Sequence, residues 1–136
     1  MSLAEKESRL VGRYAIIEDR HERLAAVTSR GKKWPPLAEG ERTDDRLVPG
    51  CSSRVWLSGD FRQGVCHFRM DADSPLVKGL AALVCELYDG ESPADIAASA
   101  PKLMELMGFD RMISPTRLHG LSQVQATIQE FARKHV

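Results

Sequence analysis

The 136 residues fit one domain, and we expect a single domain spanning residues 1–136. Hydrophobic residues make up 43% of the chain and charged residues 28%, which is the composition of an ordinary globular protein. The 19 basic side chains balance 19 acidic ones, so the sequence predicts neither a general nucleic-acid binder nor a protein of the membrane surface.

Two helices are predicted at the start of the chain. Apolar residues recur at three-to-four spacing over residues 10–17, and the pattern extends over residues 24–27. The very polar stretch 18–23 between them predicts a bend. The helical pattern ends near Gly31, and residues 1–3 are given no structural role.

An exposed loop and a small sheet are predicted next. The polar residues 38–48 indicate an exposed loop, since they follow two consecutive prolines that cannot continue a helix. Alternating apolar and polar residues predict strands at 54–58 and 65–70, joined by turn residues within 58–64. The connection is too short for a crossover, so the strands are expected to pair antiparallel. Residues 47–48 suggest a third, short strand.

The rest of the chain is predicted to be helical. A serine followed by a proline caps exposed backbone amides and suits the first helical position. The first helix that begins this way ends near Gly90, and a short helix at 103–107 precedes the last one, which runs to the C-terminus. The serine–proline pairs that predict helix starts are Ser74-Pro75, Ser92-Pro93 and Ser114-Pro115. The predicted fold class is α+β, a small antiparallel sheet of about three strands packed by several helices.

Cys51 is the first candidate for chemistry. It follows Val48-Pro49-Gly50, which places it in a turn just before a strand. Arg46 and Arg54 are near in sequence, and nearby positive charge favours the reactive thiolate. The position equally suits a small apolar residue in a tight turn, because free cysteine is most often simply buried. The local sequence leaves both interpretations open.

The other two cysteines are predicted to be core residues. Cys66 alternates with Phe68 and Met70 on one face of a strand, and Cys85 lies in an apolar helix. Three cysteines without a signal-peptide core or a membrane-spanning run indicate a reduced, cytoplasmic setting. No metal is predicted, because structural zinc sites usually contain close cysteine pairs, although spacing leaves open a site assembled in space.

Polar residues at two helix starts form a second group of candidates. Arg117 lies in the first turn of the last helix, where the helix dipole does not favour a cation, so we expect a specific role. Gly120 is costly inside a helix and indicates close packing. His119 fits an ordinary surface histidine as well as a site residue. The residues Asp71, Asp73 and Lys78 suit either the dipole of the helix that starts at 74 or a rim that a partner recognises.

Together these residues resemble the SufE-like sulfur acceptors of iron–sulfur cluster assembly, over about residues 10–133. In the family the residue after the cysteine is often Gln, and here it is Ser52. The blocks that carry the resemblance are Glu18-Asp19-Arg20, Val48-Pro49-Gly50-Cys51-Ser52-Ser53-Arg54-Val55-Trp56-Leu57, Asp71-Ala72-Asp73-Ser74-Pro75-Leu76-Val77-Lys78-Gly79-Leu80 and Ser114-Pro115-Thr116-Arg117-Leu118-His119-Gly120-Leu121.

The resemblance implies a SufE/IscU-like fold and a sulfur carrier. Proteins of this family accept persulfide sulfur from a PLP-dependent cysteine desulfurase of the SufS or CsdA kind, stimulate that enzyme and deliver sulfur to an iron–sulfur scaffold. The family's active cysteine falls on Cys51, which would hold a transient persulfide with no resident cofactor. Supporting or partner-binding roles are expected for Arg54, Asp71, Asp73, Lys78, Arg117 and His119.

Two alternatives remain open. The family resemblance implies a carrier and activator rather than a stand-alone enzyme. The first alternative is a non-catalytic adaptor that binds a desulfurase or scaffold and activates it allosterically. The adaptor would still bind and stimulate after Cys51→Ala. A metal-binding domain, the third interpretation, would carry zinc or iron after purification.

Overall fold

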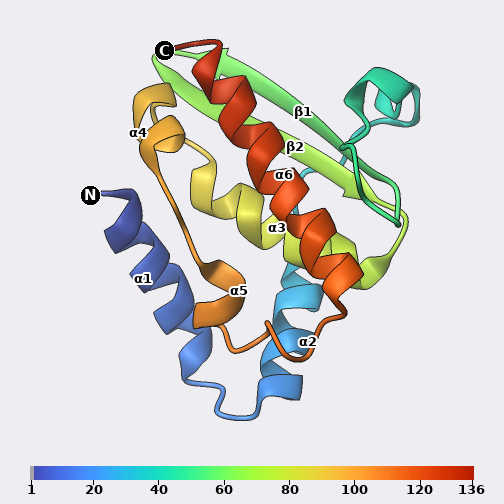
Figure 1. The fold of residues 1–136 in the computed structure, drawn as a ribbon, viewed down its shortest axis with the longest axis vertical. Coiled ribbons are helices and arrows are strands. Elements are labelled where there is room, and N and C mark those ends of the chain that lie inside the picture. Colours follow the sequence, from blue (N-terminus) through green and yellow to red (C-terminus); the bar gives the residue numbers. More distant parts are fainter. Residues whose placement is uncertain (1) are drawn as a thin grey trace.

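The computed structural model describes residues 2–136 and has the predicted α+β architecture (Figure 1). A two-stranded antiparallel hairpin is combined with helices that come before and after it in the chain. The elements are α1 (Leu3–Ala15), α2 (Arg20–Gly31), β1 (Val55–Arg62), β2 (Val65–Ala72), α3 (Pro75–Tyr88), α4 (Pro93–Ala98), α5 (Leu103–Leu106) and α6 (Pro115–Arg133), with 3-10 turns η1 (Glu39–Glu41) and η2 (Asp44–Arg46).

Helix α3 is the centre of the molecule. It packs against β2, α2, α6 and α1, and in Figure 1 it lies between the sheet and the α1–α2 pair. Ten of its residues are buried, including Leu80, Leu83 and Leu87. A helix that is covered on most sides must be apolar around most of its circumference, which explains why α3 is more apolar than α1, α2 and α6.

The serine–proline signals predicted the helix starts correctly. The hydroxyl oxygens of Ser74, Ser92 and Ser114 accept hydrogen bonds from the backbone amides three residues later, at 3.4, 3.3 and 3.3 Å. Asp19 caps α2 in the same way, so the polar stretch 18–23 contains a helix start rather than only a bend.

The first residues of the chain have a role that the sequence did not indicate. Ser2 caps α1 by accepting from the Glu5 amide at 3.1 Å, and Leu3 is buried in the core. Helix α1 therefore begins well before the predicted position 10. Met1 lies outside the described residues.

The sheet is longer but has fewer strands than predicted. Its hairpin turns at Gln63 and Gly64, which have φ values of 53° and 81°, as a two-residue connection requires. Gly59 lies inside β1, opposite Phe68, rather than in a turn. The Phe131 ring covers it and would be 2.8 Å from a Cβ at this position. The buried face of β2 is the predicted one, with Cys66, Phe68 and Met70 each at most 2% exposed.

The predicted third strand is reduced to one antiparallel bridge between Leu47 and Trp56. The Val48 amide donates to the Val55 carbonyl at 2.8 Å, but no ladder extends from this contact among the described residues. The polar composition of the preceding segment gives it few side chains with which to continue an apolar strand face.

The segment 38–48 was predicted to be an exposed loop, yet side chains from it are fixed to the sheet. The Glu41 carboxylate accepts hydrogen bonds from the two terminal guanidinium nitrogens of Arg69, at 2.8 and 2.7 Å. Arg42 pairs with Asp71. The Arg42 guanidinium also lies 5.7 Å from the centre of the Trp56 ring. Trp56 is only 5% exposed, so this polar segment covers an aromatic residue that would otherwise face solvent.

Candidate functional site

The backbone places Cys51 at a bend between the Leu47–Trp56 bridge and β1. Gly50 has a φ of 79°, a conformation that side-chain-bearing residues rarely adopt, so glycine is needed to turn the chain at this point. Val48 on one side of the bend and Val55 on the other are buried and anchored by their hydrogen bond. The cysteine therefore lies in a short loop with two fixed ends.

The thiol of Cys51 rests against the first half of α6. Its Sγ donates to the Gly120 carbonyl oxygen at 3.4 Å. A Cβ on Gly120 would lie 3.3 Å from the Sγ and 3.7 Å from the Cα of Cys51. Gly120 is therefore the close-packing residue that the sequence predicted inside the last helix, and the group packed against it is the candidate thiol.

A small pocket surrounds the thiol. Cys51 itself is half-buried, and burial raises the pKa of its thiol, so the resting group is protonated at neutral pH. The pocket is lined by Cys51, Ser52, Ser53, Val77, Thr116, Arg117 and Gly120. The site as it stands conceals a neutral thiol rather than presenting a thiolate.

The two arginines near Cys51 in sequence do not activate it in this arrangement. Arg46 donates to the Glu41 carbonyl oxygen and the Thr43 hydroxyl, both at 3.0 Å. Arg54 pairs with Asp73 at 2.8 Å. The expectation that these residues lower the pKa of Cys51 is wrong for the resting state, because their guanidinium groups are engaged elsewhere and burial dominates.

Cys66 and Cys85 are core residues, as predicted. Both are 0% exposed, and burial raises the pKa of each thiol. Within residues 2–136 no group of three or more His, Cys, Asp or Glu side chains is arranged to hold a metal ion. Of the three thiols, Cys51 alone has access to solvent.

Asp71 and Lys78 form a buried anchor beside the site rather than an exposed rim. Asp71 is 3% exposed, pairs with Arg42 and lies 3.4 Å from the Lys78 ammonium. Burial opposes the ionisation of Asp71, but the Ala72 amide, Arg42 and Lys78 outweigh it and lower the pKa of the carboxyl. This anchor joins the 38–48 segment, β2 and α3.

Asp73 lies at the surface. It is exposed, and besides its ion pair with Arg54 its amide donates to the Arg54 carbonyl oxygen at 3.1 Å. Arg54 in turn covers the Trp56 ring, at 5.3 Å from the ring centre. Arg54 and Asp73, which the sequence singled out separately, therefore form an exposed ion pair at the end of the cysteine loop.

Arg117 and His119, the two predicted site residues of α6, both lie next to the loop that carries Cys51. Arg117 is exposed and lines the pocket of Cys51. His119 contacts the loop at Gly50, where its Nε2 would be 3.3 Å from a Cβ. Gln123 lies at the same place, 3.2 Å from that Cβ position through its Cγ.

Arg42 and Gln123 are site neighbours that the sequence did not single out. Arg42 lies in a polar segment with no periodic pattern, so nothing local distinguishes it from other surface arginines. Gln123 follows His119 by one helical turn, a spacing that becomes informative only once the loop is known to pack on this face.

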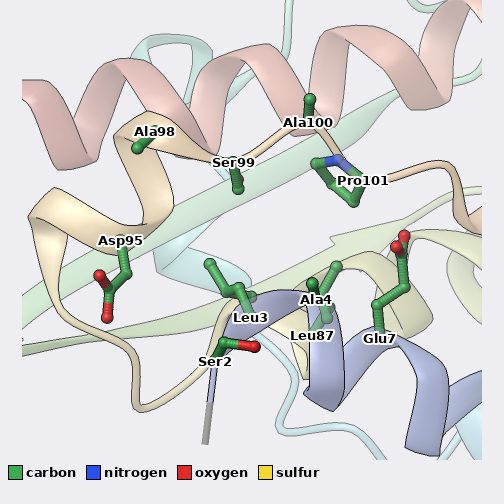
Figure 2. A pocket seen from close by; sticks show the side chains of 10 residues that line it. All are labelled: Ser2, Leu3, Ala4, Glu7, Leu87, Asp95, Ala98, Ser99, Ala100 and Pro101. Carbon is green, nitrogen blue, oxygen red and sulfur yellow. The ribbon is translucent and has the colours of Figure 1, made fainter.

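A second pocket lies away from the thiol, at the start of α1. Figure 2 shows it between the start of α1, which carries Leu3 and Glu7, and the segment from α4 to Pro101, which carries Asp95 and Ser99. Its lining contains no cysteine or histidine and none of the predicted site residues, so it is separate from the chemistry at Cys51.

No helix among residues 2–136 combines the length and the apolar character needed to cross a membrane. This finding concerns the described residues alone.

Comparison with known protein families identifies one domain type along nearly the whole chain. Residues 8–132 match the model of SufE, described as a Fe-S metabolism associated domain. An uncharacterised SufE-like protein of Rhizobium etli is 33% identical over 129 residues, covering 91% of this chain and 87% of the relative. A SufE-like protein of Synechocystis, also uncharacterised, is 29% identical over 122 residues, covering 90% and 77%.

A solved structure has the same fold. The solution structure of a hypothetical protein from Thermus thermophilus superposes with a TM-score of 0.78, at 23% identity, over 95% of this chain and 94% of that one. At this level of identity the similarity concerns the fold alone.

Proposed function

Because the chain belongs to the SufE family of domains associated with Fe-S metabolism, we propose that it is a sulfur-transfer protein that accepts persulfide sulfur on Cys51. The donor is a PLP-dependent cysteine desulfurase of the SufS or CsdA kind, which the protein stimulates by removing its product sulfur. The recipient is an iron–sulfur scaffold. The protein itself is a carrier and needs no resident cofactor for this exchange.

The observation that carries the proposal is the difference between the three thiols. Cys51 is half-buried at a glycine bend, whereas Cys66 and Cys85 have no exposed surface. A thiol must reach the outer sulfur of a donor persulfide to attack it, so access decides which cysteine can serve. The match of Val48-Pro49-Gly50-Cys51 to the family pattern supports the same residue.

The proposed exchange balances without an added oxidant or reductant. The Cys51 thiolate attacks the outer sulfur of the desulfurase persulfide, a new S–S bond forms and the donor S–S bond breaks. The donor cysteine leaves as a thiolate. The proton lost by Cys51 and the proton gained by the donor thiolate cancel, so one thiol and one persulfide exchange partners.

The resting geometry requires the loop to move during this exchange. The Cys51 Sγ is engaged by the Gly120 carbonyl, and burial keeps the thiol protonated. Rotation about Gly50 would bring the thiol to water, where it ionises more readily. Return of the loop would then place the new persulfide in the small pocket around Cys51, away from bulk solvent.

The test is a mass measurement after incubation with a desulfurase and cysteine. Cleavage after Lys and Arg places the three cysteines on separate peptides, Leu47–Arg54, Gln63–Arg69 and Gly79–Lys102. We expect the mass of one sulfur atom to be added to Leu47–Arg54. Cys51→Ser should abolish the addition, and Cys66→Ala, a core control, should retain it.

Two outcomes would overturn the proposal. One is sulfur found on Gln63–Arg69 or Gly79–Lys102 while Leu47–Arg54 stays unmodified. The other is a Cys51→Ser protein that accelerates sulfide release by the desulfurase as well as the parent does, which would show that the chain acts as a non-catalytic adaptor.

A further inference from the structure

Two consecutive residues of α6 face two consecutive residues of the cysteine loop. The Gly120 carbonyl accepts from the Cys51 thiol, and the preceding residue, His119, lies over Gly50. The His119 Nε2 would be 3.3 Å from a Cβ on Gly50 and is 3.5 Å from the Nε2 of Gln123. The imidazole is thus held at the residue about which the loop must turn for Cys51 to emerge.

The charged groups around the loop divide into paired and unpaired ones. On β1, Arg54 is paired with Asp73, and on α3, Lys78 is paired with Asp71, which also holds Arg42. On α6, neither Arg117 nor His119 has an acidic partner within 4.0 Å among residues 2–136. Arg46 of η2 also has no acidic partner in this set, but its guanidinium group donates to the Glu41 carbonyl oxygen and the Thr43 hydroxyl. The groups without an acidic partner that contact the cysteine loop therefore lie on α6.

Histidine is the residue type whose charge ordinarily changes between pH 5 and 8. Arginine stays protonated throughout this range and gives a constant background. A pH-dependent contribution to the charge near Cys51 can therefore be assigned to one side chain.

We propose that His119, in its imidazolium form, stabilises the anionic sulfur of Cys51 when the loop opens, first as the thiolate and then as the persulfide anion. It is a positioning residue that acts through its positive charge near Gly50, the residue about which the loop turns. No proton or electron is transferred in this role. The inference rests on the sulfur-transfer function of Cys51 and adds a pH-sensitive element to it.

The test uses the protein alone, without a desulfurase. The rate at which iodoacetamide alkylates Cys51 is measured on the Leu47–Arg54 peptide from pH 5.5 to pH 9 for the parent and for His119→Gln. A unit charge on a side chain that packs against Gly50, the neighbour of Cys51, in partly solvated surroundings changes thiolate stability by an amount that corresponds to about three- to tenfold in rate. At about pH 5.5 we expect Cys51 of the parent to be alkylated about three- to tenfold faster than Cys51 of His119→Gln. At about pH 8.5 we expect the two rates to be nearly equal.

A rescue variant and a distant control separate charge from structure. His119→Arg should keep the faster rate across the whole range, because its charge does not titrate. His21→Gln, at an exposed position of α2, should match the parent at every pH. Circular dichroism of each variant checks that the fold is retained.

A parent-to-variant ratio that is constant with pH would overturn the inference, because it would indicate a packing role at Gly50. The same holds if His119→Arg behaves like His119→Gln. Since sulfur transfer is measured separately, by mass after incubation with desulfurase, failure of either proposal is distinguished from failure of the other.

Discussion

At the scale of single residues, the position of the candidate thiol depends on two glycines. Gly50 supplies the φ of 79° that turns the loop, and Gly120 supplies the space in which the sulfur rests. Both glycines act by lacking a Cβ. At position 50 a Cβ would disfavour the backbone turn, and at position 120 it would crowd the sulfur. The reactivity of Cys51 is therefore controlled by backbone contacts and burial more than by neighbouring charges in the resting state.

We predict that Gly120→Ala exposes Cys51. The added Cβ would lie 3.3 Å from the sulfur, so the thiol, which is at the flexible end of its side chain, moves outward. Alkylation of Cys51 should become faster. Stability should change by less than about 1 kcal/mol, because the higher helix propensity of alanine offsets the lost contact. Peptide-resolved alkylation rates and thermal unfolding measure the two effects.

The control for this variant is Gly12→Ala, at an exposed helical position with no atom within 4 Å of the added Cβ. It should leave the alkylation rate of Cys51 unchanged. A Gly120→Ala protein that is alkylated more slowly than the parent would contradict the view that Gly120 makes room for the thiol.

At the scale of elements, the site depends on how closely α2 and α3 pack. A Cβ on Gly79 would lie 2.6 Å from the Cα of Thr28, and a Cβ on Gly31 would clash with the backbone of Gly79. The two helices therefore cross at a contact that only glycines allow. Gly79 directly follows Lys78, which pairs with Asp71, so this crossing also sets the position of the buried anchor.

We predict that Gly79→Ala destabilises the protein by about 2–3 kcal/mol, because the helices must separate to admit one methyl group into a packed backbone contact. Gly12→Ala makes the same chemical change on an exposed helix surface and should stabilise by up to about 1 kcal/mol. Urea unfolding of both variants gives the two free energies. If Gly79→Ala were as stable as the parent, the close crossing would not exist in solution.

At the scale of the whole molecule, one core cluster includes side chains from both strands and from every α-helix. Examples are Leu10 of α1, Val27 of α2, Leu57 of β1 and Ile128 of α6, and the cluster is continuous through α3. A chain that shares one core in this way is expected to unfold as a unit, which is how the predicted single domain 1–136 can be tested.

We predict one unfolding transition. Trp34→Phe leaves Trp56, which is 5% exposed on the sheet, as the only tryptophan, while far-ultraviolet circular dichroism reports on the helices. The midpoints in urea from fluorescence and from circular dichroism should coincide. Separated midpoints would show that the sheet and the helices belong to two units.

Local signals predicted much of this molecule because their causes are local. A serine hydroxyl caps an amide three residues away, and alternation in β2 places Cys66, Phe68 and Met70 on one face, so a few neighbouring residues suffice. The Pro49-Gly50 bend likewise placed Cys51 in a turn, and Gly120 indicated a close contact before its partner was known.

The amino-acid sequence by itself thus determined the starts of the three serine–proline helices, the hairpin and the residue on which the family chemistry would fall. Only the tertiary structure decided what each group touches. Cys51 meets Gly120 across 69 residues, and Arg42 meets Asp71 across 29. Such pairs form because folding brings distant segments together. The contact with α6 buries the thiol, whereas the arginines beside it are engaged by their own segment and by Asp73, which follows β2.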